Sequence, residues 1–102
     1  MRVCYVAGPY RAKTKLGIII NILKARKVAK EYWAMGYSVI CPHTNSGLIS
    51  GLPEANFLNG YLEQLKRADF MVVLPKYRKS SGTMAEIKLA YEEGIPIVYR
   101  RD

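Results

Sequence analysis

Short apolar segments alternate with longer segments of helical character along the whole chain, and this alternation constrains the fold more than any other feature. Four segments have the length and the Val, Ile and Tyr content of strands: 2–7, 37–41, 70–74 and 95–99. Between them lie three segments with helical spacing or helix-end signals: about 16–35, 53–67 and 83–93. Strands that alternate with helices predict a parallel sheet with helices on its faces.

The order of these elements predicts a Rossmann-like (flavodoxin-type) α/β three-layer sandwich with four to five parallel strands. Right-handed crossovers favour the strand order 2-1-3-4, with the first strand in a central position. Ligands of such sheets bind beyond the carboxyl ends of the strands, where the strand order reverses. We therefore expect functional residues in the three loops that meet there: 8–15, 42–46 and 75–83.

The length of 102 residues predicts one domain, because single cores divide only in much longer chains. No apolar run approaches the roughly 18 to 20 residues that cross a bilayer. The start of the chain also lacks the pattern of a signal peptide, since Gly8, Pro9 and Arg11 interrupt its apolar stretch. We expect a cytoplasmic protein in which Cys4 and Cys41 are reduced core residues.

The charge is strongly positive, with 16 Lys and Arg against 8 Asp and Glu and a net charge of +8. The first thirty residues contain 8 Lys and Arg and no Asp or Glu. Such an excess favours anionic partners, namely phosphorylated small molecules, nucleic acid or acidic surfaces, and it does not choose among them. A solvated basic helix face remains an alternative explanation.

The first two loops carry groups that suit a small polar ligand. Gly8 allows a close approach of the backbone, and Arg11 can hold a phosphate with two hydrogen bonds, although a tight turn with solvated bases fits equally. Neither the G-x-G-x-x-G pattern nor a P-loop is present, so we expect no nucleotide cofactor. His43, the single histidine, can bond a base or sugar, act as an acid, or be structural. A lone histidine is not a metal site.

The third loop leads into a helix with an anion-binding start. Ser80, Ser81, Gly82 and Thr83 offer hydroxyls and free backbone N–H groups at the positive end of the helix dipole. Glu86 follows one turn later and would face the expected cleft. The alternative is a capping box, in which the Thr83-x-x-Glu86 spacing makes the glutamate a backbone cap.

An ordered set of residues runs through nearly the whole chain: Tyr5-Val6-Ala7-Gly8-Pro9-Tyr10-Arg11, Asn21, Gly36, Pro42-His43, Ala68-Asp69, Ser80-x-Gly82-x-x-x-Glu86 and Gly94-Ile95-Pro96. This set resembles the nucleoside 2-deoxyribosyltransferase superfamily, in particular its small phage and bacterial members. It is also similar to the 2'-deoxynucleoside 5'-monophosphate N-hydrolases, and Gly82-Thr83-x-x-Glu86 resembles a motif of cytokinin-activating phosphoribohydrolases.

The resemblance implies one Rossmann-like domain over residues 1–102, with Glu86 as a nucleophile and Tyr5 near the sugar or the glutamate. It also implies a phosphate or sugar cradle from Gly8, Arg11, Ser80 and Gly82. The candidate catalytic residues are therefore Tyr5, His43 and Glu86. The candidate substrate-binding residues are Gly8, Pro9, Tyr10, Arg11, Asn45, Ser80, Ser81, Gly82 and Thr83.

One position departs from the pattern of the catalytic members. They carry an aspartate a few residues before the third strand, where this chain has Tyr61. Asp69 belongs to the opposite edge of the sheet and cannot replace it. Glycosidic cleavage usually employs two carboxyl groups, so either His43 or Tyr61 supplies a proton or the activity has been lost.

We therefore expect cleavage or transfer at the N-glycosidic bond of a (deoxy)nucleoside or its 5'-monophosphate, without a cofactor or metal. One alternative is a non-catalytic nucleotide-binding or signalling module. The other is nucleic-acid binding through the basic first helix and tyrosines, which is disfavoured because most tyrosines fall at core positions. A small sheet leaves edges uncovered, so we expect a homodimer or larger oligomer.

Overall fold

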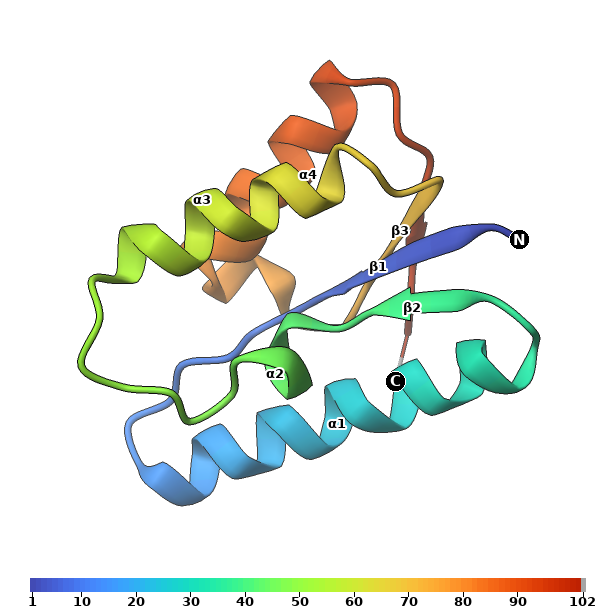
Figure 1. Ribbon diagram of the computed structural model, residues 1–102. Coiled ribbons are helices and arrows are strands. Elements are labelled where there is room, and N and C mark those ends of the chain that lie inside the picture. Colours follow the sequence, from blue (N-terminus) through green and yellow to red (C-terminus); the bar gives the residue numbers. More distant parts are fainter. Residues whose placement is uncertain (102) are drawn as a thin grey trace.

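The computed structural model describes residues 1–101, which form a four-stranded parallel sheet (Figure 1). Its strands are β1 (Val3–Ala7), β2 (Ser38–Ile40), β3 (Phe70–Val73) and β4 (Ile97–Tyr99). They lie in the order β2-β1-β3-β4, and each neighbouring pair is parallel. The fold class and the strand order predicted from the sequence are confirmed.

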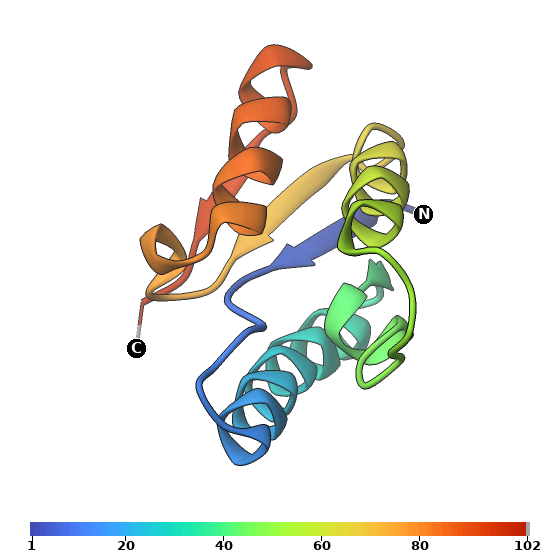
Figure 2. The same cartoon turned by 90° about the vertical axis from the view of Figure 1, so that its left-hand side faces the viewer.

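Helices cover both faces of the sheet and complete three layers (Figures 1 and 2). They are α1 (Lys15–Ala34), α2 (Pro42–Asn45), α3 (Glu54–Leu65) and α4 (Ser81–Glu92), with a 3₁₀ turn at Tyr77–Lys79. Because alternate strand residues face opposite sides, Cys4 and Val6 of β1 pack toward α1, whereas Tyr5 and Ala7 pack toward α3 and α4.

The core on the α1 side contains small and aromatic residues that recur at helical spacing. Ala25, Val28, Ala29 and Tyr32 of α1 are buried against β1 and β3. The Tyr32 ring lies 6.0 Å from that of Phe70 on β3. Six of the eight tyrosines are buried or half-buried, as the sequence predicts, and the exposed pair is Tyr91 and Tyr99.

Several element boundaries differ from the sequence prediction. Pro42 begins the short helix α2 where we expected a loop, because proline suits the first helical position and the N–H groups of Thr44 and Asn45 bond to Cys41 O. β4 starts at Ile97 and not at Ile95, since Pro96 has no N–H for the ladder. α4 starts at Ser81, two residues earlier than expected.

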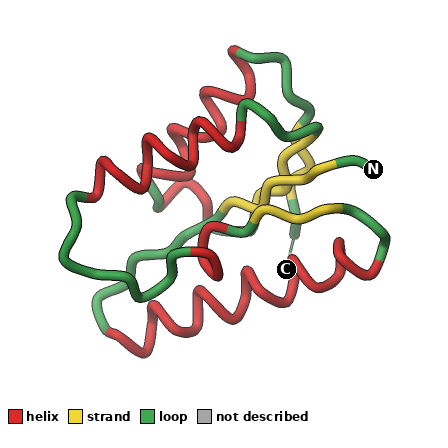
Figure 3. The backbone as a smooth tube through the Cα atoms, viewed as in Figure 1, coloured by secondary structure: helices red, strands yellow, loops and turns green. Residues whose placement is uncertain are grey.

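The amino ends of the parallel strands form one edge of the sheet and their carboxyl ends form the opposite edge, and these two edges have separate roles. At the amino edge, Asp69 Oδ2 accepts a hydrogen bond from the Val3 N–H at 2.7 Å, so Asp69 is remote from the carboxyl ends, as predicted. At the carboxyl edge, the loops that follow β1 and β3 and the short helix α2 that follows β2 come together (Figure 3). This second edge is where side chains for chemistry are assembled.

Candidate functional site

A cavity of about 960 Å³ opens at the carboxyl edge of the sheet, where the strand order reverses next to β1. Figure 2 faces this edge, with α1 below the sheet and α3 and α4 above it. Its walls come from the β1–α1 loop, α1, α3, the β3–α4 loop and the residues after β4. Ligand pockets commonly measure about 300 to 1,000 Å³, so the cavity is large enough for a nucleotide-sized molecule.

The acidic group of the cavity is Glu86, which is only 8% exposed. One of its carboxylate oxygens accepts a hydrogen bond from the Tyr5 hydroxyl. Tyr5 belongs to β1, is fully buried, and contacts Glu86 from behind the cavity wall. Sheet and helix thus hold the carboxylate from two sides, and its orientation does not depend on a mobile loop.

The environment of Glu86 and Tyr5 raises the pKa values of both side chains. Burial raises the pKa of Glu86 from 4.5 to about 7, against the opposing effect of the Tyr5 hydrogen bond. Burial and the neighbouring carboxylate raise the pKa of Tyr5 well above its ordinary value, so the phenol keeps its proton. Glu86 therefore changes its charge near neutral pH, as acids, bases and nucleophiles of active sites often do.

The start of α4 is capped by Ser80 and not by a capping box. The Thr83 N–H donates to Ser80 Oγ at 3.1 Å, and the Thr83 hydroxyl donates to the same oxygen at 2.9 Å. Glu86 bonds Tyr5 and takes no part in the cap, so the capping-box alternative is wrong. The N–H groups of Ser81 and Gly82 belong to the first turn, whose donors have no partner within the helix. They are free to bind an anion.

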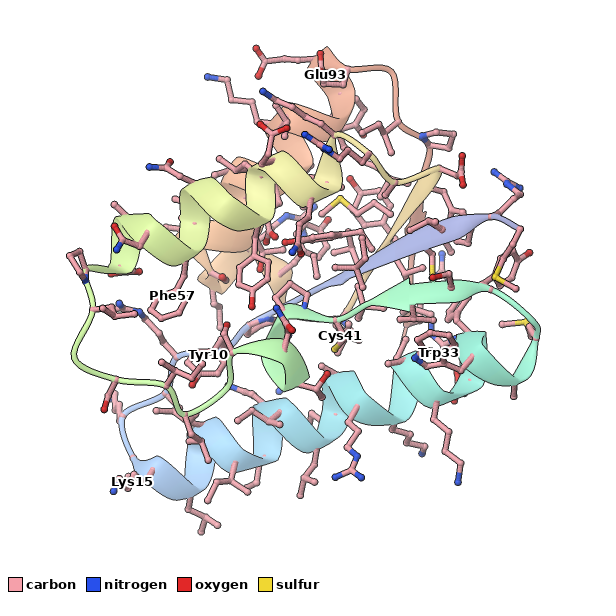
Figure 4. All side chains as sticks on the ribbon, viewed as in Figure 1. Tyr10, Lys15, Trp33, Cys41, Phe57 and Glu93 are labelled. Carbon is pink, nitrogen blue, oxygen red and sulfur yellow. The ribbon has the colours of Figure 1, made fainter. Side chains whose placement is uncertain are left out.

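The β1–α1 loop forms the next wall of the cavity, and contacts fix its shape. A Cβ on Gly8 would lie 2.8 Å from Leu74 Cβ, so only glycine fits this close approach of the two chain segments. The Tyr10 hydroxyl accepts a hydrogen bond from the Leu48 N–H at 2.9 Å. Tyr10 and Phe57 of α3 point into the space between α1 and α3 (Figure 4).

Arg11 lies in the same loop and lines the cavity. Its guanidinium forms an ion pair with the carboxylate of Glu54, and both side chains are mostly exposed. Exposed pairs of this kind contribute only about 0 to 1 kcal/mol. An incoming phosphate can therefore replace Glu54 at little energetic cost.

His43 is 4% exposed, and its ring is occupied by the protein. Nε2 lies 2.9 Å from the carbonyl oxygen of Pro9, to which the neutral ring donates. Nδ1 is buried and has no hydrogen-bond partner among residues 1–101. Burial lowers the pKa of His43 and favours this neutral form. The geometry suits a residue that holds the Gly8–Pro9 turn in place.

Tyr61, at the position of the expected aspartate, also lines the cavity. Its hydroxyl donates a hydrogen bond to Ser46 Oγ and accepts one from Asn45 Nδ2 at 3.2 Å. Asn45 itself does not line this cavity and contacts Tyr61 from outside. Ser46 and Phe57 of the cavity could not be predicted from the sequence, since a serine and a phenylalanine in these segments carry no local signal.

The structure brings most of the predicted site residues to one cavity: Gly8, Pro9, Tyr10, Arg11, His43, Ser80, Ser81, Gly82, Thr83 and Glu86. Within the described chain no three His, Cys, Asp or Glu side chains gather where they could hold a metal ion. Residues 1–101 also contain no helix that is long and apolar enough to span a membrane. Cys4 and Cys41 are buried and unpaired.

The model of one protein family, described as a domain of unknown function (DUF4406), matches residues 2–99. This chain belongs to that family. Its fold is similar to that of a 2-deoxyribosyltransferase from the psychrotolerant bacterium Bacillus psychrosaccharolyticus, with a TM-score of 0.68 and 21% sequence identity. The match covers 95% of this chain and 70% of that one. At this identity the match establishes the fold, and it confirms the resemblance seen in the sequence at the level of the fold. No curated protein matches this chain.

Proposed function

We propose that this chain breaks the N-glycosidic bond of a (deoxy)nucleoside or of its 5'-monophosphate and passes the sugar to water or to a second base. The observation that carries the proposal is the buried Glu86 carboxylate, held by Tyr5 at the wall of a cation-rich cavity. The fold shared with a 2-deoxyribosyltransferase supports this class of reaction. Neither finding requires a cofactor.

In the first step, a carboxylate oxygen of Glu86 attacks C1' of the sugar. The C1'–N bond breaks, and its electron pair leaves with the base, so that a glycosyl ester forms on the enzyme. Water or another base then attacks C1' and regenerates the carboxylate. The Tyr5 hydroxyl donates a hydrogen bond to one carboxylate oxygen of Glu86, and this fixes the direction of the other carboxylate oxygen.

A 5'-phosphate would anchor the sugar for this attack. The first turn of α4 offers the N–H groups of Ser81 and Gly82, and Arg11 lies at the same cavity. An anchor that is remote from C1' lowers the barrier because it restricts the sugar to the reactive orientation. It also explains why a strongly basic chain suits a phosphorylated substrate better than a neutral nucleoside.

The departing base needs a proton, and we assign its delivery to Tyr61. The Tyr61 hydroxyl lines the cavity and bonds Ser46, which is itself a cavity residue. His43 is less suited because Nε2 is bonded to Pro9 and Nδ1 is buried. Replacing Tyr61 by phenylalanine is expected to lower kcat with a smaller effect on KM.

The test is to incubate the protein with a panel of deoxynucleosides and their 5'-monophosphates and to follow the free base by chromatography. Glu86→Gln should abolish release, whereas Glu92→Gln, an exposed glutamate on the same helix, should not change it. Absence of release by the unmodified protein, or equal release by Glu86→Gln, would refute the proposal.

A second candidate is a nucleotide-binding module without turnover. It is favoured by the observation that the other two glutamates at the cavity, Glu31 and Glu54, are each paired with an arginine. No free second carboxylate remains among the described cavity residues for acid or base work. This candidate predicts saturable binding in calorimetry with no base released, and absence of nucleotide affinity would exclude it.

A further inference from the structure

The cavity is lined by more positive charge than a single phosphate requires. Seven basic residues line the whole cavity, against three glutamates. Arg11 is neutralised by Glu54, and Arg100 is neutralised by Glu31 at 2.7 Å. Five cations form no ion pair with any residue from 1 to 101: Lys24, Lys27, Lys76, Lys79 and Arg101.

These five residues, here called the cation cluster, come from three separate parts of the chain. Lys24 and Lys27 share one face of α1 with Glu31, at spacings of three and four. The Arg100 N–H donates to Val73 O at 2.8 Å, so the chain after β4 leaves the sheet beside the end of β3. The ion pair between Arg100 and Glu31 then docks this segment onto the α1 face. Separate segments thus bring like charges to the same cavity.

Such a convergence contributes nothing to folding, because like charges repel and none of the five is paired within the described chain. The convergence of unpaired cations on one cavity indicates an anion that binds there.

We propose that the site takes nucleotides with two or three 5'-phosphates, the outer phosphates being bound by the cation cluster. The inference rests on the proposed function, which places one phosphate at the first turn of α4. Lys76 and Lys79 precede that turn in the same loop, so a phosphate chain can continue along the loop toward α1. A monophosphate carries only about 1.5 to 2 negative charges, too few to engage five cations.

The test is calorimetry with the Glu86→Gln protein, which binds without turnover under the proposed function. The probes are the 5'-mono- and 5'-triphosphates of deoxyadenosine and deoxycytidine. The triphosphates should bind about tenfold more tightly or better, since their outer phosphates add charge-assisted hydrogen bonds to the cation cluster. The double substitution Lys24→Ala with Lys27→Ala should remove this preference.

The matched control is the double substitution Arg26→Ala with Lys30→Ala. It removes the same charge from the same helix, and neither Arg26 nor Lys30 lines the cavity. It should leave the preference for triphosphate unchanged. Equal affinity for mono- and triphosphates, or equal loss in both double variants, would overturn the inference. Tighter binding of a 5'-phosphorylated oligonucleotide than of the triphosphates would also overturn it, in favour of a nucleic-acid end.

Base release by the unmodified protein separates this inference from the proposed function. Release from monophosphates without any preference for triphosphates leaves the proposed function standing and refutes the inference. A triphosphate preference that depends on Lys24 and Lys27, without any base release, supports the inference and refutes the proposed function.

Discussion

Replacement of Glu86 by glutamine is expected to change how the stability of the protein depends on pH. Burial raises the pKa of Glu86 from 4.5 to about 7, so the folded protein holds this proton more tightly than the unfolded chain does. The resulting stabilisation is full below about pH 4.5 and is lost as the pH rises through about 7. At about 1.4 kcal/mol per pH unit, the difference between the pKa values of Glu86 in the unfolded and folded states corresponds to about 3 kcal/mol in the free energy of unfolding.

The assay is urea unfolding, followed by circular dichroism, at intervals from pH 5 to pH 8. Glutamine has no charge to lose, and its amide oxygen can still accept the Tyr5 hydrogen bond. Relative to the unmodified protein, the free energy of unfolding of Glu86→Gln should therefore increase by about 2 to 3 kcal/mol across this range. The control Glu92→Gln, exposed on α4, should show no such trend. Parallel curves for Glu86→Gln and the unmodified protein would refute the reasoning.

Three further predictions follow from the site and the surface. Base release (kcat/KM) should rise with pH through about 7, because Glu86 attacks only as a carboxylate; a flat profile would contradict this role. Gly8→Ala should destabilise the protein by about 1 to 3 kcal/mol, since its Cβ would lie 2.8 Å from Leu74, whereas a Cβ at Gly82 would lie 4.0 Å from Ser80 Oγ and should have little effect. Equal losses in urea unfolding would refute this distinction. Trp33 and other apolar side chains of α1 are exposed, so sedimentation should detect a dimer or larger species, and a monomer alone would contradict the expectation.

The fold could be predicted from the sequence because its main signals are local. The apolar runs of β1 and β3 and the glycines and prolines that bound them indicate buried parallel strands without knowledge of any partner. The same local reasoning misjudged α2, because Pro42 suits both the end of a strand and the start of a helix.

The site was only partly accessible to such reasoning. The Thr83-x-x-Glu86 spacing fits a helix cap, and only the position of Tyr5, 81 residues away in the chain, decides that the glutamate faces β1. The cation cluster was even less accessible from the sequence. The spacing of Lys24 and Lys27 is that of any solvated helix face, and its meaning depends on where the chain after β4 is docked.

The nucleophilic role of Glu86 is tested most directly by trapping the covalent intermediate. The unmodified protein is mixed with a deoxynucleoside 5'-monophosphate that it turns over, quenched in acid, digested and analysed by peptide mass spectrometry. The account predicts a deoxyribosyl phosphate on the peptide that contains Glu86 and on no other peptide. Rapid release of the base, with this carboxylate unmodified at every quench time, would contradict it.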